Sequence, residues 1–250
     1  MTDFRADGAR VLITGGTSGL GEAMARALVD AGAQVVVTSR SADRAARAAA
    51  TMGAAGVAMD VRGEADVARG VAEAFDVLGG LDVLVNNAGI GMRTVNPHFL
   101  TEPQPFWAVA PDGFRDVVDT NLTGYFLVAR EVVPRLLKAG SGRVVNVSMN
   151  HSTMNRQGFV PYGPSRAGAE ALSRIMAADL AGSPVTVNLL LPGGATATGM
   201  IPAGADPAHL LPADVMAAPI RWLCSDAAAG VHDERIVAAR FDDWLATRSR

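Results

Sequence analysis

The chain is poor in cysteine and in lysine. Its only cysteine, Cys224, excludes a framework of disulfides within the chain and any metal site built from several thiolates. Its only lysine is Lys138, and all other basic side chains are arginines. An arginine of this chain can therefore stand where related proteins have lysine through composition alone.

Long apolar runs, a large charge of one sign and low-complexity segments are also missing. No run approaches the roughly 18–20 apolar residues that span a bilayer, and the first ten residues are charged where a signal peptide needs an apolar stretch. The formal net charge of -3 provides no electrostatic attraction for nucleic acid. With 27 Gly and 13 Pro in 250 residues, disorder and a collagen-like fold are excluded. We expect a cytoplasmic globular protein with neither a membrane nor a nucleic-acid partner.

Short β-branched segments alternate with longer, alanine-rich segments along the whole chain. The short ones predict strands over 10–14, 34–39, 56–59, 82–86, 142–148 and 185–191. Helices are predicted over roughly 19–31, 41–52, 64–78, 112–138 and 161–181. Continuously apolar strands that alternate with helices indicate a parallel sheet covered on both faces. The predicted fold is a single-domain, Rossmann-like, doubly wound α/β sheet of about seven strands over residues 1–250.

Two segments interrupt this alternation. Residues 90–112 are proline-rich, and residues 192–213 are long and irregular. Both follow predicted strands at the carboxyl edge of the sheet, where open α/β sheets bind ligands. We expect these loops to form the walls of a substrate site. The side chains that predict an apolar pocket there are Phe99, Phe106, Trp107, Phe159, Met149, Met154 and Met200, while Arg93 and Arg156 leave room for a substrate carboxylate.

A glycine-rich segment over residues 14–21 directly follows the first strand and precedes the first helix. Glycines at such a turn let the backbone approach a pyrophosphate, whose charge then lies at the N-terminus of the helix. An ordinary glycine turn is the alternative, and the position between a strand and a helix favours the phosphate loop. The candidate cofactor-binding residues of this loop are Gly15, Thr17, Ser18, Gly19, Leu20 and Gly21.

Three further motifs follow in order along the chain. They are Asn86-Asn87-Ala88-Gly89 after the fourth strand, Asn121, and Tyr162 with Arg166 four residues later. Together with the glycine-rich loop they resemble the short-chain dehydrogenase/reductase family over nearly the whole chain. The resemblance implies hydride transfer between a nicotinamide dinucleotide and a ketone, an aldehyde or a secondary alcohol, while the protein moves a proton to or from the substrate oxygen. The expected partner is a small carbonyl or alcohol substrate.

In this family the end of the second strand selects the dinucleotide. An acidic residue there would hold the adenine ribose and repel a 2′-phosphate, but this chain has Ser39 followed by Arg40, whose guanidinium suits a phosphate. NADP(H) is therefore favoured over NAD(H), the alternative being that Arg40 simply begins an arginine-rich helix. Asp60 and Val61 are expected to receive the adenine, although Asp60 could equally be a helix N-cap.

The resemblance also implies cofactor contacts from two segments further along the chain. The first is the Asn-Asn-Ala-Gly motif, with Asn87, Ala88 and Gly89. The second follows the strand over 185–191 and includes Pro192, Gly193 and Thr196. Thr198 is an equal alternative to Thr196, because this segment is one residue longer than the family spacing.

The chain has only two tyrosines, and the resemblance implies that Tyr162 is the catalytic acid and base. A phenol normally titrates near ~10 and needs nearby positive charge to give up its proton at neutral pH. Arg166 lies where the family has lysine. Arginine keeps the charge and can hold the nicotinamide ribose, but it does not release a proton, which puts a relay through this side chain in question. Tyr125, within an apolar helical run, is expected in the core or in an interface.

Two polar side chains complete the expected catalytic set. By spacing, the family's substrate-binding serine falls on Met149, and Ser148 is the favoured substitute, with Ser152 second. Asn121 lies within a predicted helix, where asparagine is unfavourable unless its amide is used. The resemblance gives Asn121 a water of the relay and a local helix kink, and the alternative is an exposed or capping residue. The predicted catalytic residues are Tyr162, Arg166, Ser148 and Asn121.

Two other functions fit parts of the pattern. Halohydrin dehalogenases resemble this family and carry a Ser-Tyr-Arg triad that Arg166 fits, but their first turn has lost a glycine, whereas Gly19 and Gly21 are intact here. A dinucleotide-binding relative with impaired catalysis is the third interpretation, because Arg166 and Met149 both depart from the family pattern.

The sequence also bears on metals and on assembly. No metal site is expected, because the four histidines, His98, His151, His209 and His232, lack the spacing of metal ligands. The resemblance implies that two long helices pair between subunits. The predicted helices over 112–138 and 161–181 carry more apolar residues than one sheet face covers, so a homo-oligomer is expected, a tetramer rather than a dimer.

Overall fold

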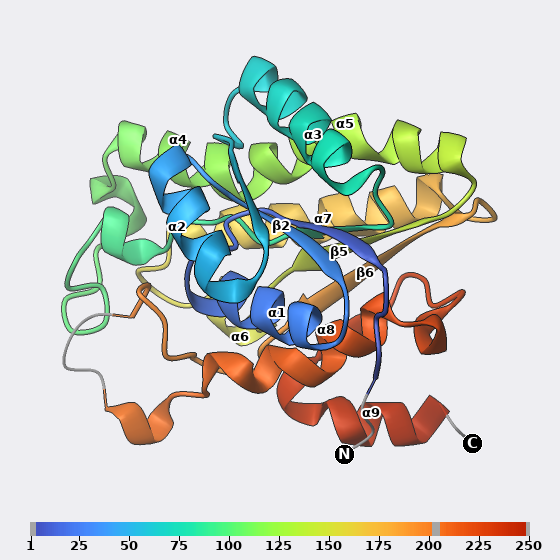
Figure 1. The fold of residues 1–250 in the computed structure, drawn as a ribbon. Helices are drawn as coiled ribbons and strands as arrows, with labels where there is room; N and C mark the ends of the chain where they lie inside the picture. The colour runs from blue at the N-terminus through green and yellow to red at the C-terminus, as the bar shows by residue number, and fades with distance from the viewer. Residues whose placement is uncertain (1–3, 202–205, 249–250) are drawn as a thin grey trace.

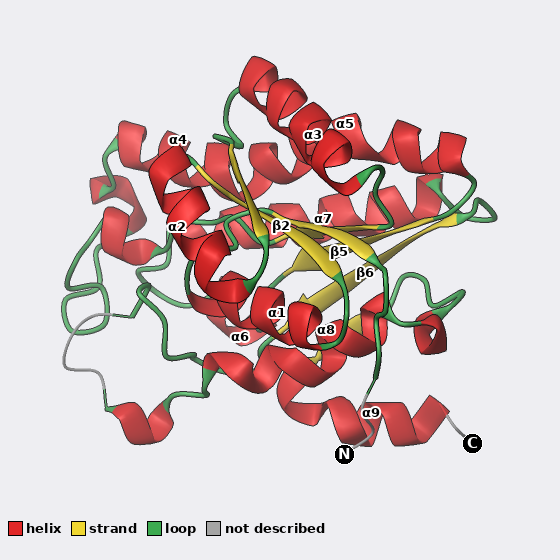
Figure 2. Ribbon diagram, viewed as in Figure 1, coloured by secondary structure: helices red, strands yellow, loops and turns green. Residues whose placement is uncertain are grey.

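A seven-stranded, parallel sheet forms the centre of the computed structural model, which describes residues 4–201 and 206–248. The strand order is β3-β2-β1-β4-β5-β6-β7. The strands are β1 (Arg10–Ile13), β2 (Gln34–Ser39), β3 (Ala55–Ala58), β4 (Val83–Asn86), β5 (Gly142–Val147), β6 (Val185–Leu191) and β7 (Arg235–Val237). Helices cover both faces of this sheet (Figure 2), which confirms the predicted doubly wound α/β fold.

Two apolar layers lie on either side of the sheet. One layer contains side chains of α1 (Gly19–Asp30), α2 (Ala42–Met52), α8 (Ala217–Cys224) and α9 (Phe241–Arg248). The other contains side chains of α3 (Glu64–Leu78), α5 (Gly124–Ala139) and α7 (Tyr162–Asp179). Figure 1 shows α3, α5 and α7 above the sheet, with α1, α8 and α9 below it.

The apolar character of the strands follows from these two layers. In β1, Leu12 packs into the layer of α3 and α5, while its neighbours Val11 and Ile13 pack into the layer of α1 and α8. All three are fully buried. Successive side chains of a strand point to opposite faces, so a sheet covered on both faces needs an apolar residue at every position.

One predicted helix differs from the structure. The segment over 112–138 consists of α4 (Pro111–Val118), a π-helical turn, η3 (Asp119–Thr123), and then α5. The other predicted helices and strands agree with the structure to within about two residues, which is the ordinary uncertainty of element ends.

The two irregular segments contain short helical turns. Residues 90–112 include η1 (Met92–Thr94) and η2 (Phe106–Ala108), and α6 (His151–Met154) follows β5. Within residues 192–213, Thr196 and Leu211 form an isolated parallel bridge, and residues 202–205 lie outside the described part. The remaining short turns are η4 (Pro207–His209), η5 (Ala213–Met216), η6 (Asp226–Ala228) and η7 (Ala238–Arg240).

The strand order makes the carboxyl end of β1 a candidate ligand site. This strand lies between β2 and β4: the connection after β1 leads to β2 on one side, and the connection after β3 leads to β4 on the other. Ligands of open α/β sheets bind at such a switch point, outside the carboxyl ends of the strands. The glycine-rich segment follows β1 and the Asn-Asn-Ala-Gly segment follows β4, so both meet at this edge. Among the described residues, no helix has the length and apolarity that a bilayer crossing needs.

The central strand β4 provides a test of this core. Leu84 is fully buried, and replacing it with alanine leaves a cavity. We expect Leu84→Ala to lower the free energy of unfolding by about 2–5 kcal/mol in urea denaturation. Val77→Ala, on the exposed surface of α3, is the control and should change it by less than about 0.5 kcal/mol. Similar losses for both variants would contradict the assignment of Leu84 to the core.

Candidate active site

The glycine-rich loop is tied to the end of β4 by one asparagine. The side-chain amide of Asn87 donates to the carbonyl oxygens of Thr14 (2.9 Å) and Gly15 (3.1 Å). The Thr14 hydroxyl accepts from the backbone N–H groups of Asn87 and Ala88, both at 3.0 Å. A Cβ on Gly21 would collide with the Asn87 amide, so only glycine lets α1 start this close to the β4 segment. Asn87 therefore holds the shape of the loop.

The N-terminus of α1 has the features of an anion site. Ser18 is its N-cap residue and makes no side-chain capping bond, and α1 begins with Gly19, Leu20 and Gly21. The first N–H groups of a helix have no partner within the helix, and the helix dipole is positive at this end. Gly15 and Thr17 lie in the turn between β1 and α1. All six predicted loop residues thus surround a helix end suited to a pyrophosphate.

The end of β2 presents an exposed arginine. The Ser39 hydroxyl accepts from the backbone N–H of Ser41 at 3.4 Å, and Ser41 caps α2 by accepting from the N–H of Arg44. Arg40 is exposed and precedes both the cap and the first helical residue, Ala42. Arg40 therefore lies just before α2 and not within it, and its role toward a phosphate stays a prediction.

Asp60, after β3, is engaged by a neighbouring arginine. Its carboxylate accepts from Arg62 Nε (3.0 Å) and Nη2 (2.7 Å), and these hydrogen bonds hold the pKa of Asp60 below its usual value, with a smaller contribution from the charge of Arg40. The N-cap of α3 is Gly63, so the interpretation of Asp60 as an N-cap is wrong. Val61 is buried and packs against Gly124.

Asn121 is fully buried in the π turn, which is the interruption of the helix expected there. Its amide nitrogen donates to the Ile90 carbonyl (3.0 Å) and to the Ser165 hydroxyl (3.1 Å). Its amide oxygen accepts from the Ile90 N–H at 2.9 Å. The interpretation of Asn121 as an exposed or capping residue is therefore wrong, and the side chain joins η3 to the loop after β4 and to α7.

Tyr162 is the first residue of α7 and is half-buried. Its ring packs against a small apolar cluster of Met92, Phe99 and Phe159, which comes from the loops after β4 and β5. Its carbonyl accepts from the Ser165 hydroxyl at 2.8 Å, and that serine in turn accepts from Asn121. The loops and the π turn thus fix the start of α7 and the tyrosine that it presents.

Arg166 lies one turn further along α7 and is buried with its charge. Its Nη1 donates to the Tyr125 hydroxyl (2.6 Å) and to the Val147 carbonyl (3.1 Å). Burial alone would lower the pKa of Arg166, but the oxygens of Tyr125 and Tyr162 outweigh it and raise the pKa above its ordinary value. The guanidinium is therefore charged at any pH at which the protein folds. No Cβ fits at Gly89, because Arg166 Nη2 occupies that space.

Tyr125 is buried in the core, as predicted, and there it contacts Arg166. It donates its hydroxyl proton to the Val147 carbonyl at 3.1 Å. The same hydroxyl oxygen accepts a hydrogen bond from Arg166 Nη1. Burial is the main reason that the pKa of Tyr125 is raised, so it stays protonated. Its position four residues after Asn121, on the same side of the helix, was the available signal.

Ser148 is held by a carboxylate that sequence reasoning missed. Its hydroxyl donates to Glu170 Oε2 at 2.6 Å, while Glu170 Oε1 receives Arg235 Nε (2.7 Å) and His151 Nε2 (2.9 Å). Arg235 also donates to the Met149 carbonyl at 2.9 Å. Glu170 lies four residues after Arg166 and eight after Tyr162, a helical spacing that places all three on one side of α7.

The two candidate threonines of the segment after β6 have different surroundings. Thr196 is buried and donates its hydroxyl to the Gly194 carbonyl at 3.2 Å, whereas Thr198 lies against Gly19 of the glycine-rich loop. Pro192 and Gly193 directly follow β6, and the Gly193 carbonyl accepts from the Asn150 amide at 2.9 Å. Thr198 is thus the threonine that reaches the glycine-rich loop.

The two predicted wall loops are in contact with each other. Arg93 Nη1 donates to the Gly199 carbonyl at 2.7 Å, and Met200 lies against Gly91. Phe99 and Phe159 form an edge-to-face pair, with ring centroids 5.6 Å apart, on which the Arg156 guanidinium packs. Phe106 and Trp107 meet edge to face and remain 68% and 76% exposed, so they are not buried in an apolar pocket in this structure. In the described residues, no group of acidic, histidine or cysteine side chains has the arrangement of a metal site.

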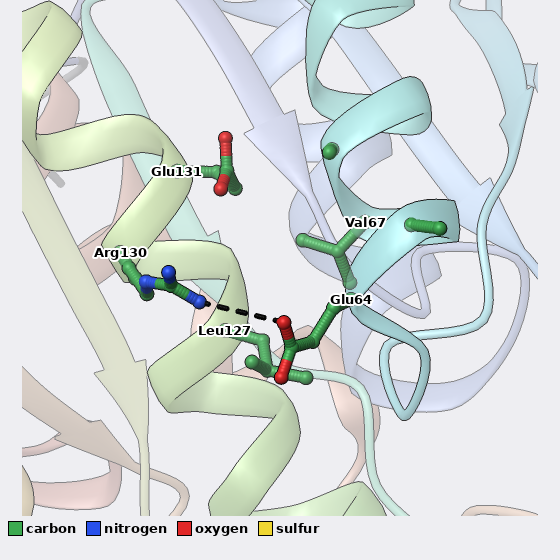
Figure 3. Close-up of a pocket in the computed structure, with 7 residues that line it drawn as sticks. Glu64, Val67, Leu127, Arg130 and Glu131 are labelled. Atoms are coloured by element: carbon green, nitrogen blue, oxygen red, sulfur yellow. Dashed lines mark ion pairs between the residues drawn. The ribbon is translucent and has the colours of Figure 1, made fainter.

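A separate cavity of about 370 Å³ lies between α3 and α5 and contains none of the predicted site residues. Figure 3 shows Glu64 and Val67 from α3 opposite Leu127, Arg130 and Glu131 from α5. Arg130 and Glu64 pair across it at 3.7 Å.

The Glu170 cluster predicts a defined response to acid. Burial would raise the pKa of Glu170, but hydrogen bonds from Ser148, His151 and Arg235 outweigh it and lower the pKa. A carboxylate with a lowered pKa stabilises the fold above its unfolded pKa of about 4.5 and loses this contribution as the pH falls through its folded pKa.

We therefore expect Glu170→Gln to unfold at lower urea concentration than the wild type at pH 7, and this difference should shrink below about pH 4.5. Glu102→Gln, at an exposed position, is the matched control and should follow the wild type throughout. A difference between Glu170→Gln and the wild type that does not depend on pH would contradict the charged network.

Known proteins share both this sequence pattern and this fold. A family model described as short chain dehydrogenase matches residues 9–206. A 3-oxoacyl-[acyl-carrier-protein] reductase of Aquifex aeolicus is 32% identical over 197 residues, which is 76% of this chain and 75% of that protein.

Two solved structures have closely similar folds. A gluconate 5-dehydrogenase of Burkholderia cenocepacia, in complex with NADP and tartrate, has a TM-score of 0.82 and 29% identity, covering 96% of this chain and 98% of that one. A 3-ketoacyl-(acyl-carrier-protein) reductase of Brucella melitensis, complexed with NADH, has a TM-score of 0.80 and 29% identity over 94% and 99% of the two chains. The chain therefore belongs to the short-chain dehydrogenase/reductase family of oxidoreductases.

Proposed function

We propose that this protein is an NADP(H)-dependent oxidoreductase that transfers a hydride between the nicotinamide and a ketone or aldehyde, or the matching alcohol. The observation that carries the proposal is a half-buried tyrosine, Tyr162, one helical turn before the permanently charged Arg166. This pair lies on the same edge of the sheet as the phosphate loop. The reductase and dehydrogenase names of the relatives agree with this reaction class.

The chain fits a dinucleotide at three places. The N-terminus of α1, which has no side-chain cap, suits the pyrophosphate, and the close packing of Gly21 against Asn87 sets where this helix begins. Asp60 and Val61 follow β3 on the adenine side, and Thr198 and Gly193 follow β6 on the nicotinamide side. Nicotinamide, when bound, supplies or accepts the hydride. Residues of the chain then bind the dinucleotide, orient the substrate and move the proton.

The preference for NADP(H) rests on the end of β2. Ser39 has no negative charge to repel a 2′-phosphate, and the exposed guanidinium of Arg40 is available for charge-assisted hydrogen bonds to one. The carboxylate of Asp60, whose pKa the charge of Arg40 lowers, is already paired with Arg62. Related structures hold NADP in one case and NADH in another, so the preference depends on these local residues.

Tyr162 is proposed to donate its proton to the substrate oxygen during reduction and to accept it during oxidation. The Arg166 guanidinium lies with its carbon 5.5 Å from the centre of the Tyr162 ring. A fixed positive charge stabilises the negative oxygen that remains after the proton has left. Arg166 cannot carry the proton further, because a guanidinium does not deprotonate. Its role is to supply charge and to hold the ribose.

Ser148, rather than Ser152, is the proposed contact for the substrate oxygen. Ser148 directly follows Val147, whose carbonyl binds both Tyr125 and Arg166, while Ser152 is exposed on α6. To donate to a substrate, the Ser148 hydroxyl has to turn away from Glu170. Asn121 is proposed to position the site, because its amide is occupied by Ile90 and Ser165.

Two observations favour this function over the alternatives. A halide-releasing lyase needs a changed first turn, but here Gly21 is intact and packs against Asn87, Gly19 is intact and lies against Thr198, and the start of α1 has no side-chain cap. A binding protein with impaired catalysis has no need of an ordered site. Here Arg166 is held by two hydrogen bonds and Tyr162 by the packing of two loops.

We also propose that the protein forms a homo-oligomer, a tetramer rather than a dimer. Large apolar side chains are exposed on the helices expected to pair: Phe114 on α4, Phe126 and Leu137 on α5, and Ile175 on α7. Each is more than a third exposed, and pairing of these helices would cover them.

Cofactor preference is tested by fluorescence titration with NADPH and, separately, NADH, using the signal of Trp107, Trp222 and Trp244 and the emission of bound nicotinamide. We expect NADPH to bind at least roughly tenfold more tightly than NADH, since a hydrogen bond to a charged group contributes about 1.5–3 kcal/mol. Arg40→Ala should remove most of this preference, while Arg47→Ala, exposed on α2, should retain it. A preference for NADH would contradict the role of Arg40. Binding of neither would contradict the proposed function.

Catalysis is tested with Tyr162→Phe in a screen of ketones, aldehydes and oxo acids. We expect turnover to fall by about 10²–10⁴-fold, the usual contribution of general acid–base catalysis, while the dissociation constant for NADPH changes little. Retained carbonyl reduction in Tyr162→Phe would show that another group moves the proton.

A further inference from the structure

Both tyrosines of the chain lie against the same buried arginine. The guanidinium carbon of Arg166 is 5.5 Å from the ring centre of Tyr125 and 5.5 Å from that of Tyr162. Tyr162 is the proposed acid and base, whereas Tyr125 has no part in moving a proton, since its own is donated to the Val147 carbonyl at 3.1 Å. Its hydroxyl oxygen is nevertheless the closest partner of Arg166, at 2.6 Å.

The charge of Arg166 is held by neutral oxygens. The side chain is only 4% exposed, and within residues 4–201 and 206–248 no carboxylate forms an ion pair with it. Nη1 makes both of its hydrogen bonds to the protein, one to Tyr125 and one to Val147. Nη2 points the other way, toward Gly89 and the side of the site where Asn121 lies. The guanidinium thus has Nη1 bound to core oxygens, while Nη2 is directed at the site.

We propose that Tyr125 is a positioning residue that adapts this active site to arginine: its hydroxyl binds Nη1 and so directs Nη2 toward the reacting groups. The catalytic part of this inference rests on the proposed function. Tyr125 comes from α5, Val147 from β5 and Arg166 from α7, so three elements set the position of the guanidinium. The fit requires a side chain whose donors lie on separate atoms.

Lysine does not meet this requirement. An arginine carries five N–H donors on a rigid fork, and it can therefore bind the core and the site at once. A lysine ammonium carries its three donors on a single nitrogen, which cannot bind the core acceptors and reach the site at the same time. In an Arg166→Lys variant, the Tyr125 hydroxyl and the Val147 carbonyl compete with the site for this nitrogen. Removing the Tyr125 hydroxyl would weaken the competition.

The inference therefore predicts that the effect of Tyr125→Phe changes sign with residue 166. The four proteins to compare are the wild type, Tyr125→Phe, Arg166→Lys and the double variant. In the wild-type background, Tyr125→Phe should lower kcat about tenfold, in line with the loss of a hydrogen bond to a charged group. Arg166→Lys should also lower kcat, and adding Tyr125→Phe to it should raise kcat severalfold. KM for NADPH is measured in parallel.

Two measurements separate positioning from simple destabilisation. Thermal unfolding of each variant reports loss of packing, which would lower Tm in both backgrounds and could not produce a gain in kcat. Thr51→Val is the matched control: it removes a hydroxyl that bonds to Ala48 and Arg26 on the far side of α1 and α2, and it should leave kcat unchanged.

Two results would overturn the inference. One is an equal effect of Tyr125→Phe on kcat in the arginine and lysine backgrounds. The other is a gain in kcat from Arg166→Lys alone. If the wild type turns over no carbonyl or alcohol with either dinucleotide, the proposed function fails. The Tyr125–Arg166 hydrogen bond is then tested by Tm alone. Tyr125→Phe should then lower Tm clearly more beside Arg166 than beside lysine, and equal losses would refute the pairing.

Discussion

A single buried positive charge organises the site. Arg166 is enclosed with no carboxylate bound to it in the described part of the chain, so its guanidinium depends on well-placed neutral oxygens. An unpaired buried charge is costly, and its partners must therefore be held firmly. The Val147 carbonyl is fixed at the end of a central strand, and Tyr125 is fixed by the helix that begins after the π turn. Gly89 provides the space for the second arm of the fork.

The parallel sheet makes this arrangement possible. The carboxyl ends of β1, β4 and β5 lie side by side, and each is followed by a segment that carries one part of the site. Asn87 ties the segment after β4 to the glycine-rich loop, and Asn121 ties it to α7. The glycine-rich loop and the start of α7, which carries the proposed acid Tyr162, are thus joined through one short stretch of chain.

The sequence predicted the strands and helices of the molecule better than it predicted which side chains contact one another. Continuous aliphatic strands and alanine-rich helices are local patterns, and they gave the sheet and most element ends correctly. An interruption of the helix at Asn121 was predicted, but its π form was not, because the residues Asp119–Thr123 do not specify which backbone form a kink takes.

The bond between Tyr125 and Arg166 and the cluster around Glu170 were not predicted, because the partners, Arg166, Ser148 and Arg235, come from distant parts of the chain. The spacing of four residues that places Tyr125 and Glu170 beside predicted site residues was visible, but such spacing occurs along every helix. In the same way, composition suggested that Phe106 and Trp107 face a pocket, whereas only the packing of the loop decides where an aromatic side chain points.

The contact between the two wall loops has a consequence for how this enzyme could acquire new substrates. Arg93 holds the carbonyl of Gly199, and Met200 covers Gly91, so the loop after β4 and the loop after β6 support each other across the mouth of the site. Exchanging one loop for that of a relative would leave a guanidinium or a carbonyl without its partner. Changes of specificity should therefore arise from paired exchanges, and the two loops form one inherited unit although more than a hundred residues separate Arg93 from Gly199.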